Sequence, residues 1–393
     1  MATSTNTTIS FPVLDTLRFV GAFAVVLTHV SFQTGQYGPS LRGTLVARGD
    51  VGVAIFFVLS GFLLSRPYFS KMAKRSNLPT AGFYLWKRVL RIMPVYLLTV
   101  IAVLSLIPES RGNFHPKWTQ NLTMTVIYGS DSLPAGLTQM WSLATEAAFY
   151  LVLPALMLIV GRVACRNRWN PTVILFVLLA LCLINLVWLA TIDLSSHRTL
   201  WLPSFLTWFC AGMAAAVASV DHSRGESRGW TSFVAKLGAA PGSCYLTAFI
   251  FLLLASTPLA GPIAGDVPTI GEAVAKNLFY VAIGFFVILP GVFAQADARS
   301  SVLMSHPAAR YLGRISYGIF SIHLLVLYFV FQMRGYEYFS GHFVEVLTLT
   351  MAGAIAASAA IYRFVERPVN GLRRLFQPKT ETAISPNANA IAN

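Results

Sequence analysis

The segment FPVLDTLRFVGAFAVVLTHVSF, residues 11–32, is an apolar stretch that contains three ionisable residues. It is about as long as an α-helix that crosses a bilayer, which needs roughly 20 residues. On such a helix Asp15, Arg18 and His29 share one face, with Arg18 and His29 about 16 Å apart along the axis. Because hydrocarbon cannot solvate ionisable groups, they usually face a bundle interior or an aqueous cavity. The segment predicts a membrane helix with functional groups; the alternative is an interfacial Asp15–Arg18 pair with an outward-reaching His29.

The composition of the whole chain supports the same assignment. Of 393 residues, 55% are hydrophobic and 11% charged, and the mean hydropathy is +0.64, which excludes an ordinary soluble protein. The sequence predicts an all-α, polytopic transmembrane bundle of about ten helices, at residues 11–32, 51–69, 89–107, 140–160, 172–192, 201–219, 244–259, 277–295, 316–333 and 343–364. The stretch at 244–259 is the shortest and ends near Pro258, so a re-entrant segment is the alternative there.

The distribution of Lys and Arg predicts the orientation. With the N-terminus inside, the cytoplasmic segments hold 21 of the 29 Lys and Arg residues and the outer loops hold seven. This bias follows the positive-inside rule and predicts ten spans with both termini in the cytoplasm. The net charge of +14 then reflects topology and does not indicate nucleic-acid binding. The expected organisation is a cytoplasmic tail at 1–10, a transmembrane domain at 11–368 and a largely disordered cytoplasmic tail at 369–393.

A basic cluster precedes the third predicted span, in KRVLRIMP, residues 87–94. Lys87 and Arg91 are four residues apart, and like charges at this spacing repel on a helix unless an anion lies nearby. A phosphate-rich ligand held by Arg88 and Arg91 would remove that repulsion. Positive-inside anchoring of the helix is the alternative explanation.

A carboxylate lies inside the fourth predicted span, in WSLATEAAFY, residues 141–150. Trp141 suits an outer membrane interface, and Glu146 falls several residues into the span, where it needs a partner. His29 is expected at a comparable depth, so the two side chains could act as a general base and its orienting partner. A purely structural hydrogen bond between them is the alternative. Trp141 and Ser142 are supporting candidates.

Two other segments contribute supporting residues. FFVLSGFLL, residues 56–64, carries Ser60 and Gly61, and small residues allow close helix approach. GRISYGIFSIH, residues 313–323, places His323 near the middle of the membrane, where a satisfied core histidine is the more ordinary interpretation. The four cysteines show no metal-ligand spacing and are expected to be packing residues, and no metal site is predicted.

In this order the segments resemble the acyltransferase 3 family of membrane-bound O-acyltransferases over nearly the whole chain. The resemblance rests on LDTLRFVGAFAVVLTH, FFVLSGFLL, KRVLRIMP, WSLATEAAFY, FCAGM, GRISYGIFSIH and VERP. It implies transfer of an acyl group, most often acetyl, from acyl-CoA to a hydroxyl of a sugar, glycolipid, cell-envelope glycan or macrolide-type product. It also implies a location in the bacterial plasma membrane and no bound cofactor, acyl-CoA being a co-substrate.

The resemblance assigns roles to the residues above. His29 would deprotonate the acceptor hydroxyl, with Glu146 orienting its ring, and Arg18, Arg88 and Arg91 would bind the acyl donor. Direct transfer and an acyl-enzyme intermediate both remain open. One alternative function is a proton-coupled exporter of a sugar or lipid that uses His29 and Glu146 as a relay. The other is a noncatalytic membrane scaffold, which leaves the buried charges unexplained.

Overall fold

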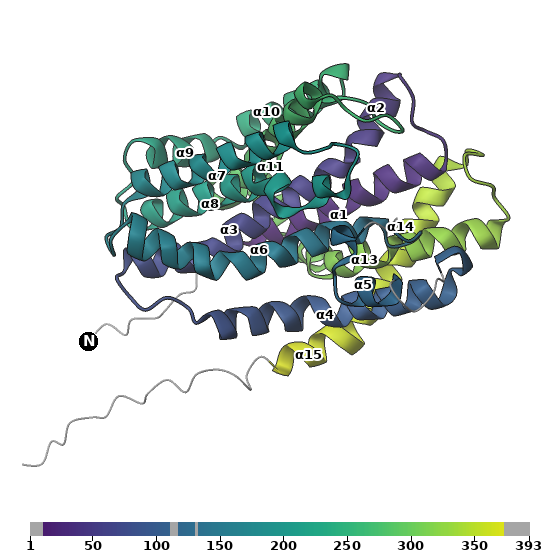
Figure 1. The fold of residues 1–393 in the computed structure, drawn as a ribbon, viewed down its shortest axis with the longest axis horizontal. Helices are drawn as coiled ribbons and strands as arrows, with labels where there is room; N and C mark the ends of the chain where they lie inside the picture. Colours follow the sequence, from purple (N-terminus) through teal and green to yellow (C-terminus); the bar gives the residue numbers. More distant parts are fainter. Residues whose placement is uncertain (1–10, 111–116, 130–132, 373–393) are drawn as a thin grey trace, which may run out of the picture.

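A computed structural model describes residues 11–110, 117–129 and 133–372 (Figure 1). Within these ranges every regular element is helical, which confirms the predicted all-α transmembrane bundle. The longer helices are α1 (Pro12–Gln33), α3 (Val51–Ala73), α4 (Ala81–Leu106), α6 (Trp141–Leu158), α7 (Pro171–Thr191), α8 (Leu206–Ser223), α11 (Ile270–Phe293), α13 (Pro307–Arg334) and α14 (Phe343–Ile361). The predicted N-terminal tail and residues 373–393 of the predicted C-terminal tail lie outside the described residues.

The short helices connect or cap the long ones. They are α2 (Leu41–Ala47), α5 (Thr119–Leu122), α9 (Trp230–Gly238), α10 (Pro241–Ala255), α12 (Arg299–Met304) and α15 (Arg367–Gly371). Of the helices that the structure describes, nine are long and apolar enough to cross a membrane, and α9 with α10 would make a tenth, bent by 93°. Pro241 begins α10, and proline cannot continue an incoming helix. The short stretch predicted at 244–259 is therefore the second half of a broken span or a re-entrant segment.

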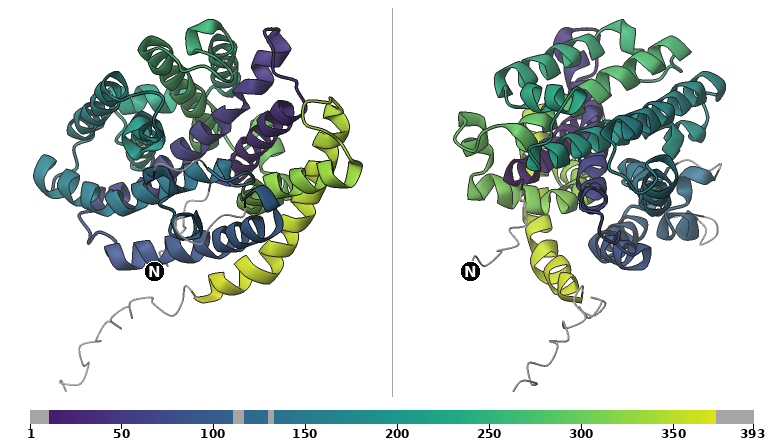
Figure 2. Two further views of the ribbon diagram at one scale, coloured as in Figure 1. Left: turned by 45° about the vertical axis from the view of Figure 1, so that its right-hand side comes forward. Right: turned by 90° about the vertical axis from the view of Figure 1, so that its left-hand side faces the viewer.

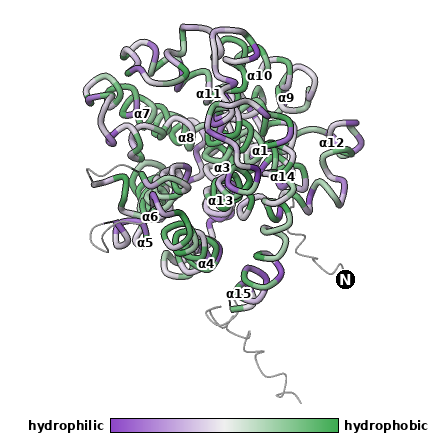
Figure 3. The backbone as a smooth tube through the Cα atoms, turned by 90° about the vertical axis from the view of Figure 1, so that its right-hand side faces the viewer, coloured by the Kyte–Doolittle hydropathy of each residue, from purple (hydrophilic) through white to green (hydrophobic). Residues whose placement is uncertain are grey.

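The helices surround a central group formed by α1, α3 and α13. Most long helices run along the horizontal axis of Figure 1, and Figure 2 shows the same bundle from two other sides. α1 packs against α13, and α3 packs against α8. Figure 3 places α1, α3 and α13 in the middle of the bundle. By contrast, apolar side chains of α7, such as Phe176 and Leu183, are 66% and 61% exposed, as expected for a surface that faces lipid.

Glycines allow the central helices to touch backbone to backbone. A Cβ on Gly61 of α3 would lie 2.1 Å from the carbonyl oxygen of Phe209, and one on Gly212 of α8 would lie 2.0 Å from that of Val58. Gly313 of α13 approaches the backbone of Asp15 on α1 in the same way, with a 2.0 Å separation. The predicted close approach of helices at Gly61 is confirmed, because no side chain would fit there.

Three long helices begin seven to nine residues earlier than hydropathy predicts, and the first is α4, which begins at Ala81 instead of residue 89. α11 begins at Ile270 instead of residue 277, because Thr269 and Glu272 form a reciprocal cap at its start. α13 begins at Pro307 instead of residue 316, since proline suits the first helical turn, and its first turns carry Arg310 and Arg314. Polar residues in the first turns lower the local hydropathy without ending a helix, so the spans predicted from hydropathy begin too late.

Candidate active site

The inward face of α1 carries Asp15 and Arg18. The Arg18 guanidinium lies 3.0 Å from the Asp15 carboxylate, and Arg310 of α13 approaches the same carboxylate at 3.9 Å. The close contact between Gly313 and the Asp15 backbone brings α13 and its arginine to this point. The i,i+3 pair offered above as an alternative therefore exists. It does not remove Arg18 from the bundle interior, because Arg18 also lines a cavity there.

That cavity, called the inner cavity below, has a volume of about 90 Å³ and lies among α1, α3, α4, α6 and α13. Its charged wall consists of Arg18, Arg88, Arg91 and Glu146. Three cations face one carboxylate, so the wall favours an anionic or strongly polar ligand. The polar residues Ser60, Ser142, Tyr150, Ser316 and Tyr317 complete the hydrogen-bonding groups of the wall.

Glu146 is held from α3, not from α1. The Ser60 hydroxyl donates a hydrogen bond to Oε1 of Glu146. Tyr150, one helical turn further along α6, lines the cavity beside it. Ser60 was predicted from the sequence as a supporting residue. Tyr150 was not predicted, although its four-residue spacing from Glu146 is visible in the sequence.

The two arginines of α4 and the neighbouring lysine have different surroundings. Arg88 and Arg91, three residues apart, face the inner cavity. Lys87 instead places its ammonium group 3.9 Å from the centre of the Phe83 ring. The face of α4 that carries the cavity charges is therefore the one with Arg88 and Arg91, and not the one with Lys87 and Arg91, where the sequence predicted charge repulsion.

His29 lies further along α1 and has a different partner from the one expected. Its Nδ1 atom is 3.0 Å from Nε2 of His323 on α13. The expected His29–Glu146 pair is therefore wrong: α1 packs directly against α13, while Glu146 is bound by Ser60. His323 is fully buried, and its Nδ1 lies 2.7 Å from the carbonyl oxygen of Phe320. The residue expected to be a supporting or core histidine is the direct partner of His29.

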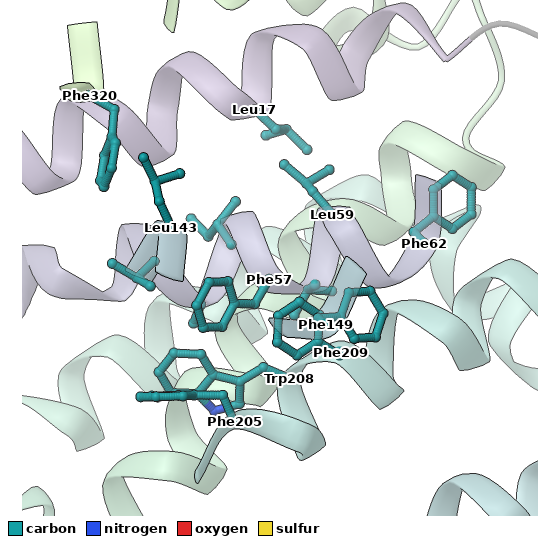
Figure 4. Close-up of a cluster of buried hydrophobic side chains, with 14 of the residues drawn as sticks. Leu17, Phe57, Leu59, Phe62, Leu143, Phe149, Phe205, Trp208, Phe209 and Phe320 are labelled. Carbon is teal, nitrogen blue, oxygen red and sulfur yellow. The ribbon is translucent and has the colours of Figure 1, made fainter. Parts of the chain in front are cut away.

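Aromatic side chains lie between the inner cavity and the histidine pair. Phe320 lines the cavity, and its ring centre is 6.2 Å from that of His323 and 5.5 Å from that of Phe56. Trp141 packs against Phe205 with ring centres 5.2 Å apart and also contacts Phe57. Figure 4 shows Phe57 and Phe205 within the aromatic cluster. Trp141 thus anchors the start of α6 by packing. Phe320 could have been found from its position one turn before His323.

Ser142 is 4% exposed, and its side chain is hydrogen-bonded to the backbone three residues earlier. Its hydroxyl donates to the carbonyl oxygen of Gln139 at 3.1 Å, and the Gln139 side-chain amide donates to the carbonyl of Ser321 on α13 at 2.8 Å. These bonds tie the start of α6 to α13. Among the described residues no three His, Cys, Asp or Glu side chains converge as metal ligands; that the reaction needs no metal stays a prediction.

Comparison with known proteins shows the family of the chain. Residues 11–363 match the family model of the acyltransferase domain. The chain is 29% identical over 199 residues to the peptidoglycan O-acetyltransferase OatA of Listeria monocytogenes, covering 45% of this chain and 28% of that protein. It is 28% identical over 269 residues to nodulation protein 10 of Rhizobium leguminosarum, covering 53% of this chain and 70% of that protein.

A third similar protein is the acyltransferase MdmB of Streptomyces mycarofaciens, 28% identical over 174 residues, which cover 41% of this chain and 43% of that protein. The matched region thus spans less than a third of the Listeria protein and less than half of the Streptomyces protein. No solved structure matches the chain significantly.

Proposed function

The chain belongs to the acyltransferase domain family, and we propose that this membrane enzyme transfers an acyl group, acetyl being the expected one, from acyl-CoA to a hydroxyl group. The proposed acceptor is a sugar, glycolipid, cell-envelope glycan or macrolide-type product. The observation that carries the proposal is the inner cavity, where Arg18, Arg88 and Arg91 face Glu146 next to the His29–His323 pair. The loop charges support an orientation with both termini cytoplasmic, and the similarity to bacterial membrane acyltransferases supports a bacterial plasma membrane location.

The size of the inner cavity limits which part of the donor it takes. Pockets for whole ligands have volumes of roughly 300–1,000 Å³, whereas the inner cavity has about 90 Å³. It therefore suits the acyl thioester end of the donor. In this proposal the thioester lies at the Phe320 end of the cavity, toward the histidine pair, and the arginine guanidinium groups donate hydrogen bonds to the rest of the bound donor. Glu146 balances the arginines and belongs to the donor cavity in this proposal.

The hydrogen bonds of the histidine pair determine which nitrogen of His29 can act as the base. A carbonyl oxygen only accepts, so Nδ1 of His323 carries the proton that is donated to Phe320. In the neutral ring Nε2 of His323 then accepts, and His29 donates to it from Nδ1. This network leaves Nε2 of His29 unprotonated and able to take a proton.

The reaction then balances with these groups. The acceptor oxygen attacks the thioester carbon while its proton moves to Nε2 of His29, and the carbon–sulfur bond breaks as the acyl–oxygen bond forms. The CoA thiolate receives a proton from His29, which returns to its starting state. In this sequence His323 positions His29 and touches neither substrate.

The donor assignment predicts that Arg91→Ala raises the Kd for acetyl-CoA about 10-fold, since a charged hydrogen bond to the donor is lost. The measurement is binding of labelled acetyl-CoA to purified protein. Lys87→Ala is the matched control, because it removes the same charge from the same helix but from a side chain directed at Phe83. Equal affinities of wild type and Arg91→Ala would contradict donor binding by this cavity.

The positioning role of His323 has its own prediction. His323→Leu removes the acceptor that holds the His29 tautomer, so kcat should fall at least about 10-fold with an unchanged Kd for acetyl-CoA. His323→Gln offers a carbonyl oxygen near the original Nε2 and should recover much of kcat. If His323 had a purely structural role, the substitutions would change the stability of the protein, and kcat would not be higher in His323→Gln than in His323→Leu. Equal kcat values for Leu and Gln variants that fold normally would reject the role.

A further inference from the structure

A second cavity lies at the end of the bundle where α3 meets α4, and it is called the loop cavity below. Its volume is about 630 Å³, and it is lined by the ends of α3, α4 and α6 and by the connections that follow α3 and α6. On these helices Met72, Ala81 and Leu158 lie seven or eight residues beyond the lining residues Leu64, Arg88 and Tyr150 of the inner cavity. At 1.5 Å per residue the two cavities are about 10–12 Å apart between the same three helices.

The loop cavity is basic and partly aromatic. Arg75, Arg162 and Arg168 line it, and none of them is in an ion pair within the described part of the chain. Trp169 also lines it, fixed by a 2.6 Å hydrogen bond from its indole nitrogen to Asp221. Guanidinium groups bind phosphates, and an aromatic ring held in place can stack with a base.

Buried polar atoms lie between the two cavities and lack partners. Tyr68 of α3 and Tyr84 of α4 are 2% and 7% exposed, and their rings contact each other with centres 5.8 Å apart. Both hydroxyl groups, and Nε of Arg88, have no hydrogen-bond partner among the described residues. Buried polar groups are nearly always satisfied, so these three atoms indicate a polar ligand that passes between α3 and α4.

The backbone of the two connections adopts costly conformations around the loop cavity. Arg75 has φ of 52° and Asn167 has φ of 58°, both in the left-handed region that favours glycine. The amide of Asn167 donates to the carbonyl of Gly161 at 2.8 Å, which holds the second connection in place. Such strain is concentrated at functional sites.

We infer that the loop cavity binds the adenosine bisphosphate end of acyl-CoA, with the arm of the donor running past Tyr68 and Tyr84 to the inner cavity. This inference rests on the proposed function, because it assumes the donor proposed there. The volume of about 630 Å³ is in the range of ligand pockets. Arg75, Arg162 and Arg168 would bind phosphates, Trp169 the base, and the two tyrosine hydroxyls the amides of the arm. The position of the loop cavity between the same three helices as the inner cavity favours this ligand over a phospholipid headgroup.

The test uses adenosine 3′,5′-bisphosphate as a probe, with the full chain purified in nanodiscs of neutral lipid. Replacing Arg162 and Arg168 together by Gln should raise its Kd at least 10-fold. Arg166→Gln is the matched control, an exposed arginine of the same connection that does not line the cavity, and it should change the Kd less than 2-fold. The double variant Tyr68→Phe and Tyr84→Phe should raise the Kd for CoA several-fold and leave the Kd for the bisphosphate unchanged.

Two results would overturn the inference. One is a Kd that is unchanged in the double arginine variant or raised equally by Arg166→Gln. The other is loss of co-purifying anionic phospholipid with unchanged bisphosphate binding, which would assign the cavity to a lipid headgroup. Binding of the bisphosphate needs no acyl transfer, so failure of the proposed function would show instead as absent transfer from acetyl-CoA with bisphosphate binding intact. S-acetylpantetheine, which lacks the nucleotide, should be used equally by wild type and the double arginine variant.

Discussion

Replacing His29 with alanine is expected to lower the rate of acyl transfer about 100-fold or more while the chain still folds and binds acetyl-CoA. General base catalysis by a positioned histidine contributes a factor of this size. Donor binding should persist, because the donor-facing charges lie in the inner cavity, which His29 does not line. Arg18, on the same helix, is about 16 Å away, so its ion pair with Asp15 is not affected.

The measurement is mass spectrometry of cell-envelope glycans and secreted products from a deletion strain complemented with each variant. A mass difference between the deletion and wild-type strains identifies the acyl group and the acceptor. His222→Ala is the control, since His222 is exposed near the end of α8. His29→Ala protein that is present at normal levels and acylates the acceptor at the wild-type rate would disprove the role of His29.

The second large effect is expected at Gly212, where a single methyl group should disrupt the bundle. In Gly212→Ala the new Cβ would lie 2.0 Å from the carbonyl oxygen of Val58 and 2.7 Å from the amide nitrogen of Phe62. Backbone atoms cannot move aside as a flexible side chain can, so α3 and α8 must separate. Overpacking of this kind costs about 3 kcal/mol. Little folded protein should be recovered from membranes, and its Tm should be lower.

Gly82→Ala provides the control for that experiment. Gly82 lies in the first turn of α4, and a Cβ there meets nothing within 4 Å. Alanine is the better helix former, so this variant should be as stable as wild type or slightly more stable. Size-exclusion profiles and thermal unfolding of both variants give the comparison. Equal Tm values for Gly212→Ala and wild type would show that α3 and α8 are not packed this closely.

The pairing of the site residues shows which features of the site can be predicted from the sequence and which cannot. Depth in the membrane follows from counting residues along a helix, and it placed His29 and Glu146 at comparable levels. Counting does not reveal which helices are neighbours. His29 and His323 are 294 positions apart, and only the packing of α1 against α13 brings them together. Ser60, 86 positions from Glu146, was likewise identified as a candidate but not as its partner.

The sequence alone determined that this is a helical membrane protein and which residues are worth testing, because a charged or polar side chain in hydrocarbon is costly unless it faces the interior. Asp15, Arg18, His29, Arg88, Arg91, Glu146 and His323 were all visible for that reason. Tertiary structure decided which partners these residues have, that Lys87 is directed at Phe83 and not into the inner cavity, and that a loop cavity forms where α3 meets α4. The physical reason is that contacts among helices depend on the shape of their surfaces, above all the glycines that allow close approach. These contacts join residues far apart in the chain, which no local pattern encodes.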